Sequence, residues 1–150
     1  MSSIATLYRM NRSAVPGLVK AAQDDDESPL GYLAEHGREQ DEFGWSGYVL
    51  MYLLEYLEES GVTFGVQDYR SEVDAINVGD DLVYLVTAAD RSQLPALAPD
   101  TLDLAAIRAF FAEMEYEFDE LDLAVADAVG ILRDQITTLD DEQLVVIHIG

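Results

Sequence analysis

Residues 44–61 read GWSGYVLMYLLEYLEESG, and apolar side chains occupy most of this stretch. Its aromatic residues recur at steps of three and four positions: Trp45, Tyr48, Tyr52 and Tyr56. On a helix this spacing places the four rings in one stripe, and leucine and valine side chains extend the apolar surface around most of the circumference. Such a helix belongs at the centre of a small fold. We predict a central helix near residues 42–60, beginning near Asp41 or Glu42 and ending at Gly61.

The aromatic stripe has two interpretations. The favoured one is core packing, in which the rings are buried and the tyrosine hydroxyls reach outward to water. The alternative is a ligand groove with aromatic walls, formed by Trp45, Tyr48, Tyr52 and Tyr56. Alanine substitution separates the two, because only a buried ring loses a large burial energy when it is removed.

Apolar strands are predicted at both ends of the chain. Residues 3–10 (SIATLYRM) show an alternating pattern that is typical of a strand. The run at residues 143–150 (QLVVIHIG) predicts a second strand, because side chains along a strand alternate between its two faces. Those faces carry Leu144, Val146 and His148 on one side and Val145, Ile147 and Ile149 on the other.

Two more strands are predicted in the middle of the chain. Residues 62–69 (VTFGVQDY) and residues 81–87 (DLVYLVT) are rich in β-branched and aromatic side chains, and the second run is the stronger of the two. A turn at Gly79 and Asp80 is expected to join them. Helices between apolar strands predict an α+β fold, with a mixed β-sheet of N-terminal, middle and C-terminal strands packed with several helices.

Capping residues indicate two helices in the first quarter of the chain. Ser13 is expected to cap one helix, with Pro16 in its first turn. Ser28 is expected to cap the next, which Pro29 begins and Gly37 ends.

The second half of the chain shows similar signals. Thr87 and Asp90 have the spacing of a capping box, for a helix that Pro95 ends or kinks. Thr101 is expected to cap another helix, and a last helix is predicted over residues 119–137.

The charge balance is the most unusual property of the sequence. Thirty acidic side chains face eight basic ones, which gives a formal net charge of -22. Such a field repels nucleic-acid phosphates and anionic membrane surfaces, so direct binding to either is disfavoured. It attracts a basic protein, a polyamine or a cation. The favoured interpretation of the charge is nevertheless that it serves solubility, including solubility in a salty cytoplasm.

Length and composition limit the protein further. The chain has 150 residues, the size of one domain, and we expect residues 1–150 to form a single α+β domain. It has no cysteine, which excludes disulfides and thiolate metal sites. No apolar run resembles a signal peptide or a membrane span, so a cytoplasmic protein is expected.

The residue types that carry chemistry form no recognised motif. Three glutamates alternate with apolar residues and predict an extended, half-buried segment: Glu113, Glu115 and Glu117. The acidic run at residues 24–27 lacks the spacing of a calcium-binding loop. His36 and His148 are too far apart in sequence to form a metal-binding pair by themselves. We therefore predict no catalytic residue, no cofactor site and no metal site.

Several segments resemble the YfbM-like bacterial proteins, a domain family of unknown function. The resemblance rests on the N-terminal strand around Ile4, the tryptophan-led helix DEFGWSGYVLMYLL at residues 41–54, and YLVTAADRSQL at residues 84–94. It also includes the EME sequence at residues 113–115 and the closing strand LVVIHIG. The resemblance implies an α+β fold and brings no established reaction.

These observations favour a non-catalytic binding or interaction protein with a strongly acidic surface. An inhibitor or an immunity protein directed against a basic partner is one form of that role. The alternative is a small enzyme or a ligand-binding protein that uses an aromatic pocket beside Trp45, Tyr48 and Tyr52.

Overall fold

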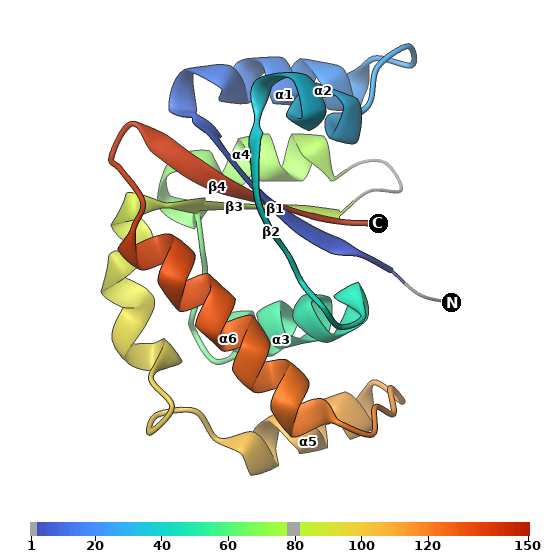
Figure 1. Ribbon diagram of the computed structural model, residues 1–150, viewed down its shortest axis with the longest axis vertical. Coiled ribbons are helices and arrows are strands. Elements are labelled where there is room, and N and C mark those ends of the chain that lie inside the picture. Colours follow the sequence, from blue (N-terminus) through green and yellow to red (C-terminus); the bar gives the residue numbers. More distant parts are fainter. Residues whose placement is uncertain (1–2, 78–81) are drawn as a thin grey trace.

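A four-stranded sheet forms the middle of the molecule (Figure 1). The computed structural model describes residues 3–77 and 82–150. The strands are β1 (Ala5–Asn11), β2 (Arg38–Glu42), β3 (Leu82–Thr87) and β4 (Gln143–Ile149), in the spatial order β2-β1-β4-β3. The predicted α+β class is confirmed, as is the origin of the strands in the N-terminal, middle and C-terminal parts of the chain.

The sheet is antiparallel throughout, whereas the sequence predicted a mixed one. The strand β4 runs antiparallel to both β1 and β3, so these two strands share one direction. Because β4 lies between them, no two strands of the same direction are neighbours. The order of the strands therefore explains the difference.

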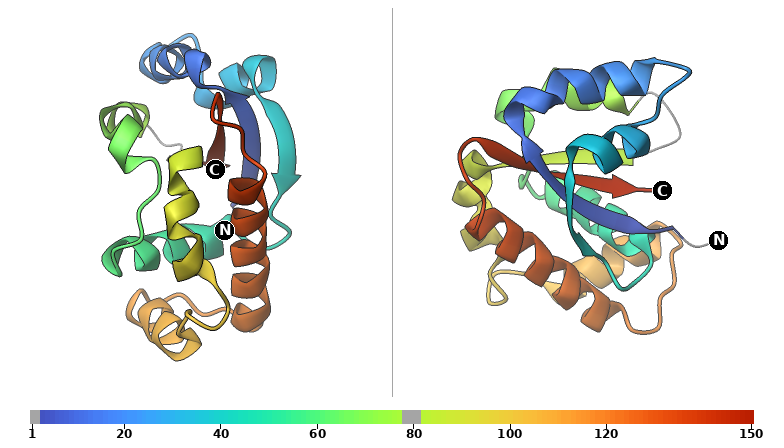
Figure 2. Two further views of the ribbon diagram at one scale, coloured as in Figure 1. Left: turned by 90° about the vertical axis from the view of Figure 1, so that its left-hand side faces the viewer. Right: turned by 45° about the horizontal axis from the view of Figure 1, so that its top comes forward.

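Helices cover both faces of the sheet. One group is α1 (Val15–Gln23), α2 (Pro29–His36) and α4 (Val66–Ile76), and a short 3₁₀ turn η1 (Arg12–Ala14) precedes it. The other group is α3 (Gly47–Glu59), the 3₁₀ helix η2 (Ala88–Leu97), α5 (Leu104–Glu113) and α6 (Leu121–Thr137). Both views in Figure 2 keep the sheet between α1, α2 and α4 on one side and α3, α5 and α6 on the other.

Each face of the sheet has its own buried cluster of apolar side chains. The prediction for β4 is confirmed: Leu144 and Val146 join the cluster beneath α1, while Val145, Ile147 and Ile149 join the cluster beneath α3 and α6. His148 lies on the same face as Leu144 and is buried. Burial on both faces explains why five of the seven residues of β4 are apolar, with Gln143 and His148 as the exceptions.

The central helix begins later than predicted. Helix α3 starts at Gly47, where the Ser46 hydroxyl accepts a hydrogen bond from the Tyr48 amide (3.3 Å). Residues 38–42, which include the predicted start at Asp41 and Glu42, form the edge strand β2 instead. All five side chains of β2 are exposed, and charged residues of this kind protect a sheet edge from pairing with other strands.

Residues 62–69 do not form the predicted strand. Gly65 adopts a left-handed conformation (φ 66°) and begins α4, which continues to Ile76. The β-branched composition misled the prediction, because strand propensity depends strongly on packing context. The predicted strand at residues 81–87 is confirmed as β3. The turn expected at Gly79 and Asp80 lies outside the described residues.

The capping predictions had mixed outcomes. The helix between Ser28 and Gly37 is confirmed, with the Ser28 hydroxyl accepting from the Gly31 amide (3.0 Å). The Ser13 prediction is wrong, because Ser13 lies inside η1 and α1 begins at Val15.

In the second half of the chain, the Thr87 and Asp90 capping box is confirmed. It begins η2, and Pro95 lies inside that helix rather than ending it. The Thr101 prediction is wrong: Asp103 caps α5 and accepts a hydrogen bond from the Ala106 amide (3.1 Å). The last helix begins two residues later than predicted and ends at the predicted residue.

Side chains cover the outer edge of β3. The Asn77 amide donates to the Val83 carbonyl (2.8 Å) and accepts from the Val83 amide (2.7 Å). Further along the same edge, the Asp90 carboxylate accepts from the Thr87 amide (2.8 Å) and from the Gly65 amide (2.9 Å). These contacts satisfy backbone groups that a neighbouring strand would otherwise use.

Candidate functional site

The aromatic stripe of α3 packs against rings from α5 and from the segment that follows it. The ring contacts join Trp45 to Phe118 (5.7 Å), Tyr48 to Tyr116 (6.1 Å), Tyr52 to Phe111 (5.7 Å) and Tyr116 (5.3 Å), and Tyr56 to Phe110 (5.8 Å). We call these eight side chains the aromatic seam. Most of the contacts are edge-to-face, the geometry that aromatic pairs prefer.

The fold therefore brings together all four residues of the predicted stripe, and each contacts an aromatic ring of α5 or of the segment after it: Trp45, Tyr48, Tyr52 and Tyr56. All four are partly buried. The Trp45 indole Nε1 also donates to the Asp127 carboxylate (2.7 Å) on α6. The sequence identified one side of this seam and missed the other. The repeated aromatic residues at 110, 111, 116 and 118 were the available signal.

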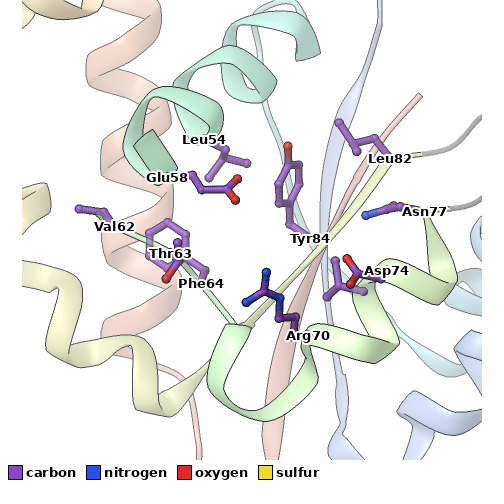
Figure 3. A pocket seen from close by; sticks show the side chains of 11 residues that line it. Leu54, Glu58, Val62, Thr63, Phe64, Arg70, Asp74, Asn77, Leu82 and Tyr84 are labelled. Carbon is purple, nitrogen blue, oxygen red and sulfur yellow. The ribbon is translucent and has the colours of Figure 1, made fainter. Parts of the chain in front are cut away.

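A hollow of about 330 Å³ lies elsewhere on α3, near its last turn (Figure 3). It is half open to solvent and is lined by the end of α3, the segment at residues 62–64, α4 and the edge of β3, and the side chains of Glu58 and Arg70 are exposed. Its walls combine apolar side chains with a few polar ones: Leu54, Val62, Phe64, Val73 and Leu82, with Glu58, Thr63, Arg70, Asp74, Asn77 and Tyr84. Small-molecule sites in proteins have this size and mixture.

Among the residues that the structure describes, five polar side chains of the hollow have no hydrogen bond or ion pair: Glu58, Thr63, Arg70, Asp74 and Tyr84. In Figure 3, the Tyr84 hydroxyl lies on the same side as Glu58, and Arg70 reaches in from the opposite side. Burial raises the pKa of Tyr84 to about 12, and the charges of Glu55 and Glu58 add to the increase. The phenol is therefore a neutral donor at physiological pH.

The last turn of α3 concentrates negative charge next to this hollow. It carries Glu55, Glu58 and Glu59 and no basic residue. Burial raises the pKa of Glu55, and the neighbouring carboxylates Glu59 and Glu58 raise it further. Acidic side chains are unfavourable at the C-terminal end of a helix, where the helix dipole is negative. The turn therefore loses stability by carrying them.

A second acidic cluster lies on β2. Glu39, Asp41 and Glu42 are exposed there, and we call them the β2 cluster. Beneath them, burial raises the pKa of Tyr8, and the charges of Glu39 and then Glu42 raise it further. The β2 cluster therefore produces a negative potential that reaches the neighbouring strand.

Several of the few basic side chains are engaged in structural contacts at one place. Arg9 donates to the carbonyl oxygens of Thr138 and Gln135 (both 3.3 Å), at the end of α6. Arg12 donates to the Asp141 carbonyl (3.4 Å), and Arg91 donates to the Leu139 carbonyl and pairs with the Asp141 carboxylate (3.7 Å). We call Arg9, Arg12 and Arg91 the arginine clamp.

The remaining residues singled out in the sequence are dispersed. His36 is exposed at the end of α2, where its ring lies 4.3 Å from the Tyr32 ring. His148 is buried in β4, and the acidic run at residues 24–27 is exposed. Within the described parts of the chain, no three His, Asp or Glu side chains gather as metal ligands do.

The segment at residues 113–118 differs in part from the extended form that was predicted. Glu113 ends α5, and Glu115 adopts a positive φ of 56° in a turn. Beyond the turn, Tyr116 and Phe118 are half-buried while Glu117 is exposed, as an alternating segment requires. The predicted pattern thus holds only after the turn.

Comparisons with protein-family models, curated proteins and solved structures find no match for this chain. The resemblance to the YfbM-like family therefore stays a prediction. No helix within residues 3–77 and 82–150 is both long enough and apolar enough to cross a membrane.

Proposed function

We propose that this protein is a non-catalytic, cytoplasmic interaction protein that binds a basic protein through its acidic surface. The observation that carries the proposal is that too few basic side chains are present to neutralise the acidic ones. Acidic side chains exceed basic ones by 22, and the arginine clamp uses three of the eight bases in contacts that include backbone carbonyls. Long-range attraction to a basic partner follows from a field of this kind.

The β2 cluster is the surface that we propose for docking. Glu39 and Glu42 lie opposite Tyr8 and Thr6 on one face of the sheet edge, Asp41 lies opposite Leu7 on the other face, and every side chain of β2 is exposed. The basic residue on the same strand, Arg38, forms no ion pair with any described residue. A partner that presents lysine or arginine side chains would neutralise this cluster. An inhibitor or immunity protein against a basic enzyme is one form of this role.

The test measures binding of an arginine octapeptide at several salt concentrations. The test variant is Glu39→Gln with Asp41→Asn and Glu42→Gln, and the control is Asp24→Asn with Asp25→Asn and Asp26→Asn. Both remove three negative charges, and both target exposed residues. We expect the β2 variant to lose roughly tenfold or more in affinity and the control to lose about threefold or less.

Equal losses in the two variants would contradict the proposal. Binding would then depend only on total charge, and the acidity would be assigned to solubility. Affinity that does not fall with added salt would also contradict it, because attraction between exposed charges is screened by salt.

A further inference from the structure

The hollow beside α3 carries polar groups of both signs around an apolar space. Glu58 and the Tyr84 hydroxyl lie on one side, and Arg70 and Asp74, both from α4, lie on the other (Figure 3). Leu54, which is buried, and Phe64 supply part of its apolar wall. A ligand that matches this arrangement has separate charged groups on an apolar body.

Arg70 differs from most of the other arginines in this chain. Hydrogen bonds within the protein are donated by Arg9, Arg12, Arg91, Arg108 and Arg133. Arg70 has no such contact with any described residue, although two carboxylates, Glu58 and Asp74, line the same hollow. A guanidinium keeps its charge at all physiological pH values, so this one is available to an anionic group of a ligand.

The side of the hollow that carries Glu58, across from Arg70, favours a cation. Glu58 lines it, and the other two carboxylates of the last turn of α3 are close by in sequence. The Tyr84 hydroxyl adds a hydrogen-bond donor for an oxygen atom, and its ring adds an aromatic surface. An ammonium group placed here would relieve the mutual repulsion of the carboxylates.

The net charge of the ligand follows by elimination. A net anion is repelled by the formal charge of -22. A simple cation brings a second positive charge into the small space that already holds Arg70, where Asp74 is the carboxylate on the same side of the hollow. A molecule with one ammonium and one carboxylate satisfies both sides without opposing the field.

We infer that this hollow binds a small zwitterion of the α-amino-acid type with an apolar side chain. Its carboxylate lies on Arg70, its ammonium lies on Glu58, and its side chain packs on Leu54, Val62 and Phe64. A hollow of about 330 Å³ is in the range that accommodates such molecules. This inference does not depend on the basic partner, because the β2 cluster contributes no residue to the hollow.

Three related probes test the charge requirement: L-phenylalanine, N-acetyl-L-phenylalanine and L-phenylalaninamide. The first is a zwitterion, the second an anion and the third a cation, and all three carry the same ring. Binding is measured by calorimetry and by NMR shifts of the Leu54 and Val62 methyl groups. We expect L-phenylalanine to bind at least about tenfold more tightly than either derivative and to shift both methyl groups.

Two variants with matched controls test the assigned roles. Arg70→Ala is compared with Arg38→Ala, which removes an exposed arginine that also has no ion pair with a described residue. Glu58→Gln is compared with Glu59→Gln, which removes a charge from the same turn outside the lining of the hollow. We expect each lining variant to weaken L-phenylalanine binding roughly tenfold and each control to change it less than about twofold.

Several results would overturn the inference. One is the absence of methyl shifts at up to about 10 mM of each probe. Another is tighter binding of the amide together with stronger binding after Arg70→Ala, which would assign the hollow to cations. Equal losses in the lining variants and their controls would show that only bulk charge acts. None of these results bears on the octapeptide test of the β2 cluster, so the two proposals fail separately.

Discussion

At the scale of single residues, Gly65 occupies a position where both the backbone conformation and the surrounding space disfavour a side chain. It has a φ of 66°, and a Cβ atom built there would lie 2.2 Å from the Leu85 carbonyl oxygen. Gly61 also has a positive φ (90°), but no atom lies within 4 Å of its Cβ position. A side chain at Gly61 would therefore meet only backbone strain, whereas a side chain at Gly65 would meet backbone strain and steric overlap together.

We expect Gly65→Ala to lower the free energy of unfolding by at least about 3 kcal/mol, because it adds overlap with backbone to the left-handed strain. Gly61→Ala carries only the strain and should cost about 1 kcal/mol. Urea unfolding followed by the fluorescence of Trp45, the single tryptophan, measures both changes. Similar midpoints for the two variants would show that β3 can move away from the added methyl group.

The aromatic seam supports a second prediction. Tyr52 contacts the rings of Phe111 and Tyr116, and its hydroxyl makes no hydrogen bond with any described residue. Tyr52→Phe should therefore change stability by less than about 0.5 kcal/mol. Tyr52→Ala should cost about 2–3 kcal/mol, because a half-buried ring and two ring contacts are lost. Parental urea midpoints for Tyr52→Ala would favour the groove interpretation instead.

Tyr84 gives a prediction for alkaline pH. Its pKa is raised to about 12 in the folded protein, mainly by burial, while a tyrosine in the unfolded chain keeps its ordinary pKa of 10.0. The unfolded state therefore loses its proton first, and stability falls as the pH rises from about 10 to about 12. Tyr84→Phe should show a shallower decline across this window in denaturant titrations. An unchanged slope would mean that other groups control alkaline unfolding.

Sequence reasoning at this scale found residues but not their partners. The stripe of Trp45, Tyr48, Tyr52 and Tyr56 follows from helical spacing alone, whereas the rings that meet it lie more than fifty residues later in the chain. Asn77 and Arg70 carried no signal, because a single amide or guanidinium becomes informative only when its surroundings are known. The hollow was missed for this reason.

At the scale of elements, the last turn of α3 is the least favourable part of a helix that is otherwise well packed. Glu55 and Glu59 are four residues apart, so their side chains are neighbours on the helix surface. Both also face the negative end of the helix dipole. The turn is therefore a place where a single charge reversal stabilises the protein.

We expect Glu59→Lys to raise the free energy of unfolding by about 0.5–1 kcal/mol, through a favourable pair with Glu55 and with the helix dipole. Glu117→Lys is the control, because Glu117 is exposed outside any helix and the net charge changes equally. Thermal melts of the two variants measure the difference. Equal gains would assign the effect to total charge rather than to the turn.

The helices and strands that were predicted correctly from the sequence are those whose apolar residues follow the period of the structure they form. The strands β1, β3 and β4 and the helix α6 carry apolar residues in the period of their structure. The strand β2 was missed because its five residues are polar or charged, and only the neighbouring strand β1 makes it a strand. The helix α4 was missed because Gly65 was not expected to begin a helix.

At the scale of the whole molecule, repulsion between carboxylates opposes the folded state. A formal charge of -22 on a chain of this size is concentrated when the chain is compact and spread out when it unfolds. Added salt screens this repulsion. We expect the melting temperature to rise between about 10 mM and about 150 mM NaCl, as measured by calorimetry. A fall over this range would show that attractive pairs outweigh repulsion.

The side-chain amide of Asn77 affects how the protein ages during storage. Asn77 fills both hydrogen-bonding positions of Val83 on the outer edge of β3. Hydrolysis of that amide consumes water, releases ammonia and leaves a carboxylate, so the donor to the Val83 carbonyl is lost and two oxygens face each other. The aged molecule then leaves the Val83 carbonyl unpaired on the outer edge of β3, and unpaired groups on a strand edge favour pairing with another copy. Electrostatic repulsion between copies still keeps them apart, and concentrated salt in storage would remove that last protection.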